Sequence, residues 1–327
     1  MTPNQIASAL QILLAIRQPV FIWGPPGVGK SQVVRQAAEA MNMEIADIRA
    51  VLLDPVDLRG LPRITDQGES VWCQPSFLPR GGRGIVFLDE LNAAPPLVQA
   101  ACYQLILDRR IGEYVLPDGW TVVAAGNRET DRAVTHRMPS ALANRMVHLH
   151  FESNLFDWIE WARCHGIDPR VIAFLKLRPA LLHDFDPQRA EKAFPSPRSW
   201  EFASAILAAA ATRSEAINII AGTVGKGAAA ELDGFLRIHD QLPDVEQMLS
   251  NPESADIPED PAVICAVCES LARRASTENM PGLATLAMRM PAEFGVLLMR
   301  EAAASDPSIV GTEAFGQWAS ANAQVLM

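Results

Sequence analysis

Short apolar runs alternate with amphipathic segments over the first 150 residues of the chain. Apolar runs bounded by turn residues predict strands, whereas apolar residues three and four apart predict helices. We expect strands near 20–23, 44–48, 84–88, 120–125 and 146–151 and helices over 29–41 and 95–108. Strands that alternate with helices favour a parallel sheet covered on both faces. Residues 1–152 are therefore predicted to form an α/β domain.

Two stretches rich in turn residues interrupt this alternation. Residues 52–80 contain Asp66-Gln-Gly68, and residues 109–119 contain apolar positions before Pro117-Asp-Gly119. Both patterns predict β-hairpins. Insertions of this kind usually lie on the ligand side of an α/β domain or at a protein contact. The segment 60–72 is therefore a candidate partner-binding hairpin, with a solvated hairpin as the alternative.

No strand pattern returns after residue 151. Residues 153–240 predict a helical domain, in which Pro195-Ser-Pro197 marks a sharp boundary. Residues 241–261 are acidic and contain Pro, which indicates a linker, and residues 262–327 predict two to three further helices rich in Ala, Met and Leu. We therefore expect the α/β domain to be followed by a helical domain, a linker and a helical extension.

The composition is that of a globular protein, with 49% hydrophobic and 20% charged residues in 327. No apolar run reaches the ~20 residues of a membrane span. The first basic residue is Arg17, which argues against a signal peptide. Five scattered cysteines do not form a disulfide framework. Cys265 and Cys268 are expected in the core, with a metal or redox pair as the alternative. The expected location is the cytoplasm.

The net charge of −10 is unevenly distributed. Residues 231–262 contain nine acidic residues and one basic residue. The chain therefore lacks the basic footprint of a protein that mainly binds nucleic acid. The acidic segment is expected to be solvated, with docking of a partner as the alternative.

One segment matches the pattern G-x-x-x-x-G-K-[ST] of a phosphate-binding loop. A predicted strand precedes it and a predicted helix begins inside it. Glycines let backbone N–H groups turn towards phosphate oxygens, and the helix N-terminus adds its positive end. Lys30 can reach the β- and γ-phosphates, and the hydroxyl of Ser31 can ligate Mg²⁺. The predicted loop consists of Gly24, Pro25, Pro26, Gly27, Val28, Gly29, Lys30 and Ser31.

Three polar residues follow predicted core strands. Asp89 and Glu90 end the run Ile85-Val-Phe-Leu88, and Asn127 follows the strand at 120–125. Asp89 can hold Mg²⁺ through water, and Glu90 can act as the base that polarises an attacking water. The amide of Asn127 can orient that water. His148 and His150 alternate on the last predicted strand, and a structural role is favoured over a metal site.

The four motifs, in this order, resemble those of AAA+ ATPases. They are the loop at 24–31, Val86-Phe-Leu-Asp-Glu-Leu-Asn92, Ala124-Ala-Gly-Asn127 and Pro139-Ser-Ala-Leu-Ala-Asn-Arg145. Within that superfamily the chain is most similar to the MoxR branch. This finer resemblance rests on Asp57-Leu-Arg-Gly-Leu-Pro62, on the two hairpins and on Ser196-Pro-Arg198. It implies a P-loop NTPase sheet with an all-α lid domain.

The resemblance also implies residue roles. The loop at 24–31 corresponds to Walker A, Asp89 and Glu90 to Walker B, and Asn127 to sensor 1. Arg145 corresponds to the arginine finger that reaches the nucleotide of a neighbouring subunit, and Arg198 to the sensor 2 arginine, which contacts the γ-phosphate in cis. The rival candidates for the finger are Arg128, Arg132 and Arg137.

For function, the resemblance implies ATP and Mg²⁺ as cofactors and a homo-oligomeric ring, with a hexamer as the expected form. It further implies remodelling or maturation of a protein client, with a von Willebrand factor A (VWA) domain protein as the expected partner. One alternative is a nucleic-acid motor or restriction-type translocase, which the acidic balance disfavours. Another is a nucleotide-gated switch without turnover, which the presence of Glu90 disfavours.

Overall fold

The structure is a computed structural model that describes residues 1–131, 136, 138–189, 191–240 and 242–322. The chain divides into two compact units, Met1–Ala230 and Glu231–Met327. The first unit contains the sheet and the helices that follow it, and the second unit is helical. Within the described residues, no helix is long and apolar enough to cross a bilayer.

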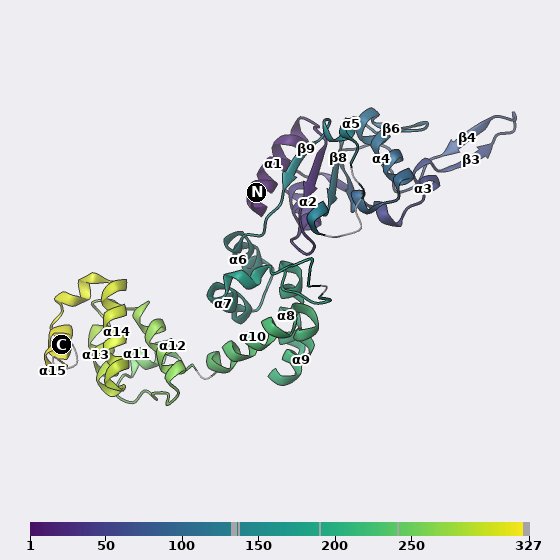
Figure 1. Cartoon of the computed structure of the whole chain (residues 1–327). Helices are drawn as coiled ribbons and strands as arrows, with labels where there is room; N and C mark the ends of the chain where they lie inside the picture. The colour runs from purple at the N-terminus through teal and green to yellow at the C-terminus, as the bar shows by residue number, and fades with distance from the viewer. Residues whose placement is uncertain (132–135, 137, 190, 241, 323–327) are drawn as a thin grey trace. The chain divides into compact units, whose positions relative to one another are not determined.

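The first unit is built on a five-stranded sheet in the order β2-β5-β8-β1-β9. All four strand pairs are parallel, which confirms the predicted α/β class (Figure 1). The central strands β5 and β8 are buried almost throughout because helices cover both faces. The strands are β1 (Val20–Trp23), β2 (Glu44–Arg49), β5 (Gly84–Asp89), β8 (Trp120–Gly126) and β9 (Val147–His150).

Alternate residues of each strand belong to two different cores. Ile85 and Phe87 pack with residues of α1 (Pro3–Ala15) and α2 (Lys30–Ala40) on one face. Val86 and Leu88 pack with residues of α4 (Pro96–Asp108) on the other face. The period of two follows from the geometry of the pleated strand.

Both predicted hairpins are present. The first pairs β3 (Leu61–Ile64) with β4 (Ser70–Cys73), extends away from the sheet (Figure 1), and leaves all of its strand residues exposed. The second pairs β6 (Arg110–Ile111) with β7 (Tyr114–Val115). Its turn lies at residues 112–113, whereas the sequence at 117–119 turns the chain into β8.

In the part of the chain that the structure describes, five short helices lie between the strands and longer helices of the α/β part of the first unit. They are η1 (Ala50–Leu52), α3 (Pro55–Arg59), η2 (Leu91–Ala93), η3 (Glu129–Asp131) and α5 (Ser140–Ala143).

Helices complete the first unit, as predicted. Trp200 is fully buried and packs on Phe174, with ring centroids 5.5 Å apart. Ser196 caps the helix that begins at Pro197, which explains the boundary seen in the sequence. The elements are α6 (Leu155–Cys164), α7 (Pro169–Leu177), η4 (Pro179–Leu182), α8 (Pro197–Ala209), α9 (Arg213–Val224) and α10 (Lys226–His239), within which the division between the units falls.

The second unit differs from the expected linker and extension. The acidic stretch contains a helix, α11, whose Val245 and Met248 are buried in the core of this unit. Four further α-helices follow where two to three were expected. The elements are α11 (Val245–Ser250), α12 (Pro261–Ala272), α13 (Met280–Arg289), α14 (Ala292–Ser305), η5 (Pro307–Gly311) and α15 (Glu313–Ala321).

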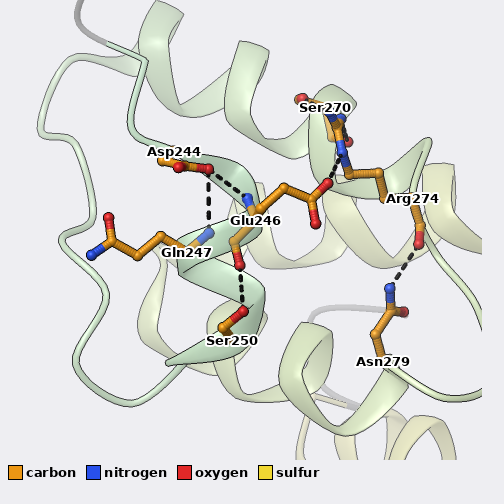
Figure 2. Close-up of polar contacts among 7 residues, drawn as sticks. All are labelled: Asp244, Glu246, Gln247, Ser250, Ser270, Arg274 and Asn279. Atoms are coloured by element: carbon orange, nitrogen blue, oxygen red, sulfur yellow. Dashed lines mark hydrogen bonds and ion pairs between the residues drawn. The ribbon is translucent and has the colours of Figure 1, made fainter.

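Polar contacts hold α11 in place (Figure 2). Asp244 caps the helix, and Glu246 forms an ion pair of 2.7 Å with Arg274 just after α12. The amide of Asn279 donates to the main-chain carbonyl of Arg274 at 2.7 Å.

In α12, Cys268 is buried as expected, but Cys265 is exposed.

Candidate active site

The loop between β1 and α2 has a backbone suited to binding an anion. Gly27 and Gly29 have positive φ angles of 79° and 100°, and α2 begins at Lys30. Turned backbone of this kind directs N–H groups into a concavity, and the helix N-terminus adds partial positive charge. The predicted phosphate loop thus has the strand–turn–helix context that its chemistry needs.

Lys30 lies among backbone and amide oxygens. Its Nζ donates to the carbonyls of Gly24 at 2.7 Å and Pro25 at 3.0 Å, and to Oδ1 of Asn127 at 3.0 Å. Burial lowers the pKa of Lys30 to about 8, although the carboxylates of Asp89 and other acids oppose this effect. The ammonium group is therefore charged at neutral pH and close to its titration range.

The hydroxyl of Ser31 donates a hydrogen bond of 2.9 Å to Oδ2 of Asp89. The two predicted metal ligands therefore lie together. Glu90, the next residue, is exposed and has the unusual left-handed φ of 54°. Its N–H donates to Oδ1 of Asp89 at 3.0 Å. This turn separates the two acids, because it leaves Asp89 beside Ser31 and brings Glu90 out of the sheet core.

Sheet order explains why the predicted residues meet. β8 lies between β5 and β1, so the residues after these three parallel strands gather at one edge. Asp89 and Glu90 come from β5, Asn127 follows β8, and the phosphate loop follows β1. The structure therefore brings together Lys30, Ser31, Asp89 and Asn127 through direct or shared contacts.

The helical part of the unit touches the phosphate loop. The N–H of Arg198, in the first turn of α8, donates to the carbonyl of Gly27 at 3.3 Å. A Cβ on Gly27 would lie 2.7 Å from Oγ of Ser196, so this close approach requires glycine. The side chain of Arg198 is exposed, and its positive charge contributes to the lowered pKa of Lys30.

The four candidate finger arginines differ in their surroundings. Arg145 is exposed, and its contacts among the described residues are made by its main chain. Arg128 donates from Nη2 to the carbonyl of Phe151 at 2.9 Å in its own chain, so it is engaged within the unit. Arg132 and Arg137 lie outside the described residues.

Two residues near the loop were missed by the sequence analysis. The ring Nε2 of His183 lies 3.2 Å from the carbonyl of Pro26, and burial lowers the pKa of this histidine. Asn92 is buried and donates from Nδ2 to the carbonyl of Asn127 at 2.7 Å. His183 has no motif around it. Asn92 lies two residues after Glu90, in the segment 86–92 that was compared with a known motif, and this position was the available signal.

The two histidines of β9 have different surroundings among the described residues. His148 accepts from Nε1 of Trp23 at 2.9 Å, and its Nε2 lies 2.8 Å from the carbonyl of Ala143. Both ring nitrogens therefore serve the fold, in agreement with the structural role favoured by the sequence. His150 is exposed.

The residues present fit ATP and Mg²⁺. The glycine turns and Lys30 suit a polyphosphate, and the paired hydroxyl of Ser31 and carboxylate of Asp89 are the oxygen donors that Mg²⁺ prefers. Exposed Glu90 adds a carboxylate beside them. A phosphate loop, paired oxygen donors and an exposed carboxylate form the set of groups that a P-loop nucleotide hydrolase needs.

The part of the chain that contains this site is similar in sequence to known proteins. Residues 19–146 match the AAA domain of the dynein-related subfamily. The chain is 29% identical over 171 residues to midasin of Giardia intestinalis, an alignment that covers 48% of this chain but only 4% of midasin. The match and the site agree in residues 19–146, which contain the phosphate loop, Asp89 and Asn127 and whose donors suit ATP and Mg²⁺.

Solved structures with similar folds are distant in sequence. The RuvB Holliday junction branch migration motor of Thermotoga maritima is 17% identical, with a TM-score of 0.41. That alignment covers 82% of this chain and 80% of the RuvB chain. NtrX from Brucella abortus, solved with ADP, is 16% identical, with a TM-score of 0.42 and coverage of 98% of this chain and 68% of the NtrX chain. At this distance the likeness concerns the fold alone.

Proposed function

We propose that this chain forms an oligomeric ring, with a hexamer as the expected form, that hydrolyses ATP at its subunit interfaces and remodels a protein client in the manner of the MoxR branch. The observation that carries the proposal is the meeting of Lys30, Ser31, Asp89 and Asn127 at one sheet edge, with Glu90 exposed beside them. This constellation suits hydrolysis, because a base and a water-orienting amide adjoin the phosphate loop.

Each residue has a separate task in this proposal. Lys30 and the N–H groups of the loop hold the phosphates, while Ser31 and Asp89 hold the metal ion. Bound Mg²⁺ supplies positive charge that offsets the charge on the phosphate oxygens. Glu90 takes the proton of the attacking water, which Asn127 orients. Arg198 acts in cis, since its helix begins on the phosphate loop.

The trans role of Arg145 is supported by its exposure. Its side chain has no partner within the described part of the chain, whereas Arg128 is bound to the carbonyl of Phe151. An arginine supplied by a neighbouring subunit can accelerate phosphoryl transfer by ~10³–10⁵. A ring would place Arg145 of one subunit at the nucleotide of the next.

The hairpin β3–β4 supports a protein client. Leu61 and Ile64 are 66% and 77% exposed, and Trp72 is 38% exposed. Exposed apolar side chains on a projecting hairpin are suited to contact another protein. We propose a client that carries a VWA domain, as the MoxR resemblance suggests. The first unit has equal numbers of acidic and basic residues, 23 of each, which disfavours a nucleic-acid substrate.

The five cysteines are all unpaired. Free thiols are typical of a reducing compartment, and we propose that the protein acts in the cytoplasm.

Mixing two inactive variants tests the ring and the trans finger together. Arg145→Ala subunits retain Glu90, and Glu90→Gln subunits retain Arg145, so a mixed ring contains some complete interfaces. We expect ATPase activity to reappear on mixing and to peak at intermediate ratios. Arg128→Ala mixed with Glu90→Gln serves as the control. Its ATPase activity should show no comparable maximum at intermediate ratios. Absence of recovery at every ratio would contradict a finger in trans. ATPase stimulation by DNA would instead favour the nucleic-acid motor.

A further inference from the structure

Asn92 connects the two strand ends that carry the proposed catalytic groups. It lies in the short helix η2, directly after the turn of Glu90, and the residue is only 3% exposed. Its Nδ2 donates to the main-chain carbonyl of Asn127 at 2.7 Å. A carbonyl can only accept, so this contact fixes which end of the Asn92 amide faces β8.

Close packing leaves this amide little freedom. A Cβ on Gly126 would overlap Oδ1 of Asn92, so glycine is required at the end of β8. Oδ1 of Asn92 is buried and has no hydrogen-bond partner within the described residues. A buried acceptor without a partner is costly. The amide is therefore held by its single donor contact to Asn127 and by the shape of the site around it.

The main chain of Asn92 is held as well. Its carbonyl accepts from the N–H of His136 at 2.7 Å and from Nε2 of Gln99, in α4, at 3.4 Å. The N–H of Ala93 donates to the carbonyl of Glu90 at 2.9 Å, which closes the turn that presents Glu90. One residue thus links the turn of Glu90, helix α4 and the end of β8.

We infer that Asn92 is a positioning residue for ATP hydrolysis, which sets the amide of Asn127 relative to Glu90. The inference rests on the proposed roles of these two residues. Without the amide of Asn92, the carbonyl of Asn127 loses its anchor, and the water held between Asn127 and Glu90 is misplaced. The phosphate loop is untouched, because Asn92 makes no contact with it in the structure's described part. Loss of the anchor therefore lowers turnover and spares nucleotide binding.

The test measures kcat and the Kd for ATP in Asn92→Ala, Asn127→Ala and the double variant, all in the full-length chain. We expect Asn92→Ala to lower kcat roughly tenfold to a hundredfold and to change Kd less than about twofold. If Asn92 acts through Asn127, the double variant should be no slower than Asn127→Ala. Multiplied effects in the double variant, or a kcat for Asn92→Ala within twofold of wild type, would overturn the inference.

Three further variants, one of Asn92 and two controls, complete the test. Asn92→Ser retains a small polar side chain that is too short for the contact, so it should fold and show the same split between kcat and Kd. Asn279→Ala removes an amide that donates to a main-chain carbonyl at the same 2.7 Å, but in the second unit, and kcat should stay unchanged. Glu90→Gln separates the two proposals. If it is inactive while Asn92→Ala and Asn92→Ser are fully active, the proposed site stands and the role of Asn92 fails.

Discussion

The hydroxyl of Ser31 and the carboxylate of Asp89 are joined by a hydrogen bond of 2.9 Å, although 58 residues separate them in the chain. Ser31 lies in the first turn of α2, and Asp89 is the last residue of β5. The contact places two hard oxygen ligands side by side at the end of the phosphate loop. This pairing is the feature of the site that most directly suits a divalent cation.

We predict that Ser31→Ala and Asp89→Asn weaken the dependence of nucleotide binding on Mg²⁺. Wild-type protein should bind ATP more tightly with Mg²⁺ than without it, because Ser31 and Asp89 would hold the metal ion and its charge would offset that of the phosphates. In each variant that difference should shrink several-fold. Titration calorimetry with and without Mg²⁺ measures it. Asp47→Asn is a suitable control, because that carboxylate pairs with Arg35 outside the site. An unchanged Mg²⁺ effect in both site variants would exclude this metal position.

Replacement of Glu90 by Gln should separate binding from hydrolysis. The amide keeps the size of the side chain but cannot take a proton, so kcat should fall by ~10²–10⁴ while the Kd for ATP changes little. Glu44→Gln, at the opposite end of the β2–β5 pair, should leave kcat unchanged. Retained turnover in Glu90→Gln would assign the proton transfer to a different group. The inactive variant should also retain the proposed client in the ATP state, so it is a suitable bait for a pull-down.

Local patterns explain why much of this site could be predicted. The phosphate loop, the strand that ends in Asp89 and the strand before Asn127 are each contained in a few consecutive residues, with strand boundaries correct to within one or two positions. The contact between these three segments depends on the order of the strands in the sheet, for which the sequence carries no direct signal. We expected them to lie close together because a parallel sheet brings the carboxyl ends of its strands to one edge.

The contacts that were missed are tertiary. His183 reaches Pro26 from a segment more than 150 residues away, and no neighbouring residue marks it. The helix α11 was also missed, because acidic and Pro-containing sequence outweighed two apolar residues, Val245 and Met248. These residues are three apart, so they share one face of a helix, and the second unit buries that face.

The contact between Gly27 and Ser196 predicts an unequal cost for two glycine substitutions. Gly27 and Gly82 have φ angles of 79° and 78°, so alanine at either position carries a similar strain of about 1–2 kcal/mol. Only at Gly27 would the new Cβ collide with a buried group, 2.7 Å from Oγ of Ser196. At Gly82 the nearest atom is the flexible carboxylate of Glu44, at 3.4 Å.

We therefore expect Gly27→Ala to lower the thermal unfolding midpoint more than Gly82→Ala does, with an additional loss of about 1–3 kcal/mol from overpacking. Gly27→Ala should also weaken ATP binding, because the N-terminus of α8 no longer packs against the phosphate loop. Calorimetric scans with and without ATP report both effects. Equal destabilisation by the two substitutions would show that the contact with Ser196 is not retained in solution.

The lowered pKa of Lys30 gives ATP binding a pH dependence of definite sign. Burial brings the pKa to about 8, so the side chain is mostly protonated at pH 7 and mostly neutral at pH 9.5. The anionic phosphates favour the protonated form. The Kd for ATP should therefore rise roughly tenfold per pH unit well above pH 8. Fluorescence titration with a labelled ATP analogue across pH 6.5–9.5 measures this rise.

Lys30→Arg identifies the group responsible. A guanidinium stays charged throughout this range, so the Kd of the variant should show no rise above pH 8, even where the different shape of arginine weakens binding overall. The phosphates lose their last proton near neutral pH, so their own titration does not produce a rise above pH 8. If wild type and Lys30→Arg weaken in parallel as the pH increases, the titrating group is not Lys30, and its burial against Gly24 and Pro25 does not govern phosphate binding.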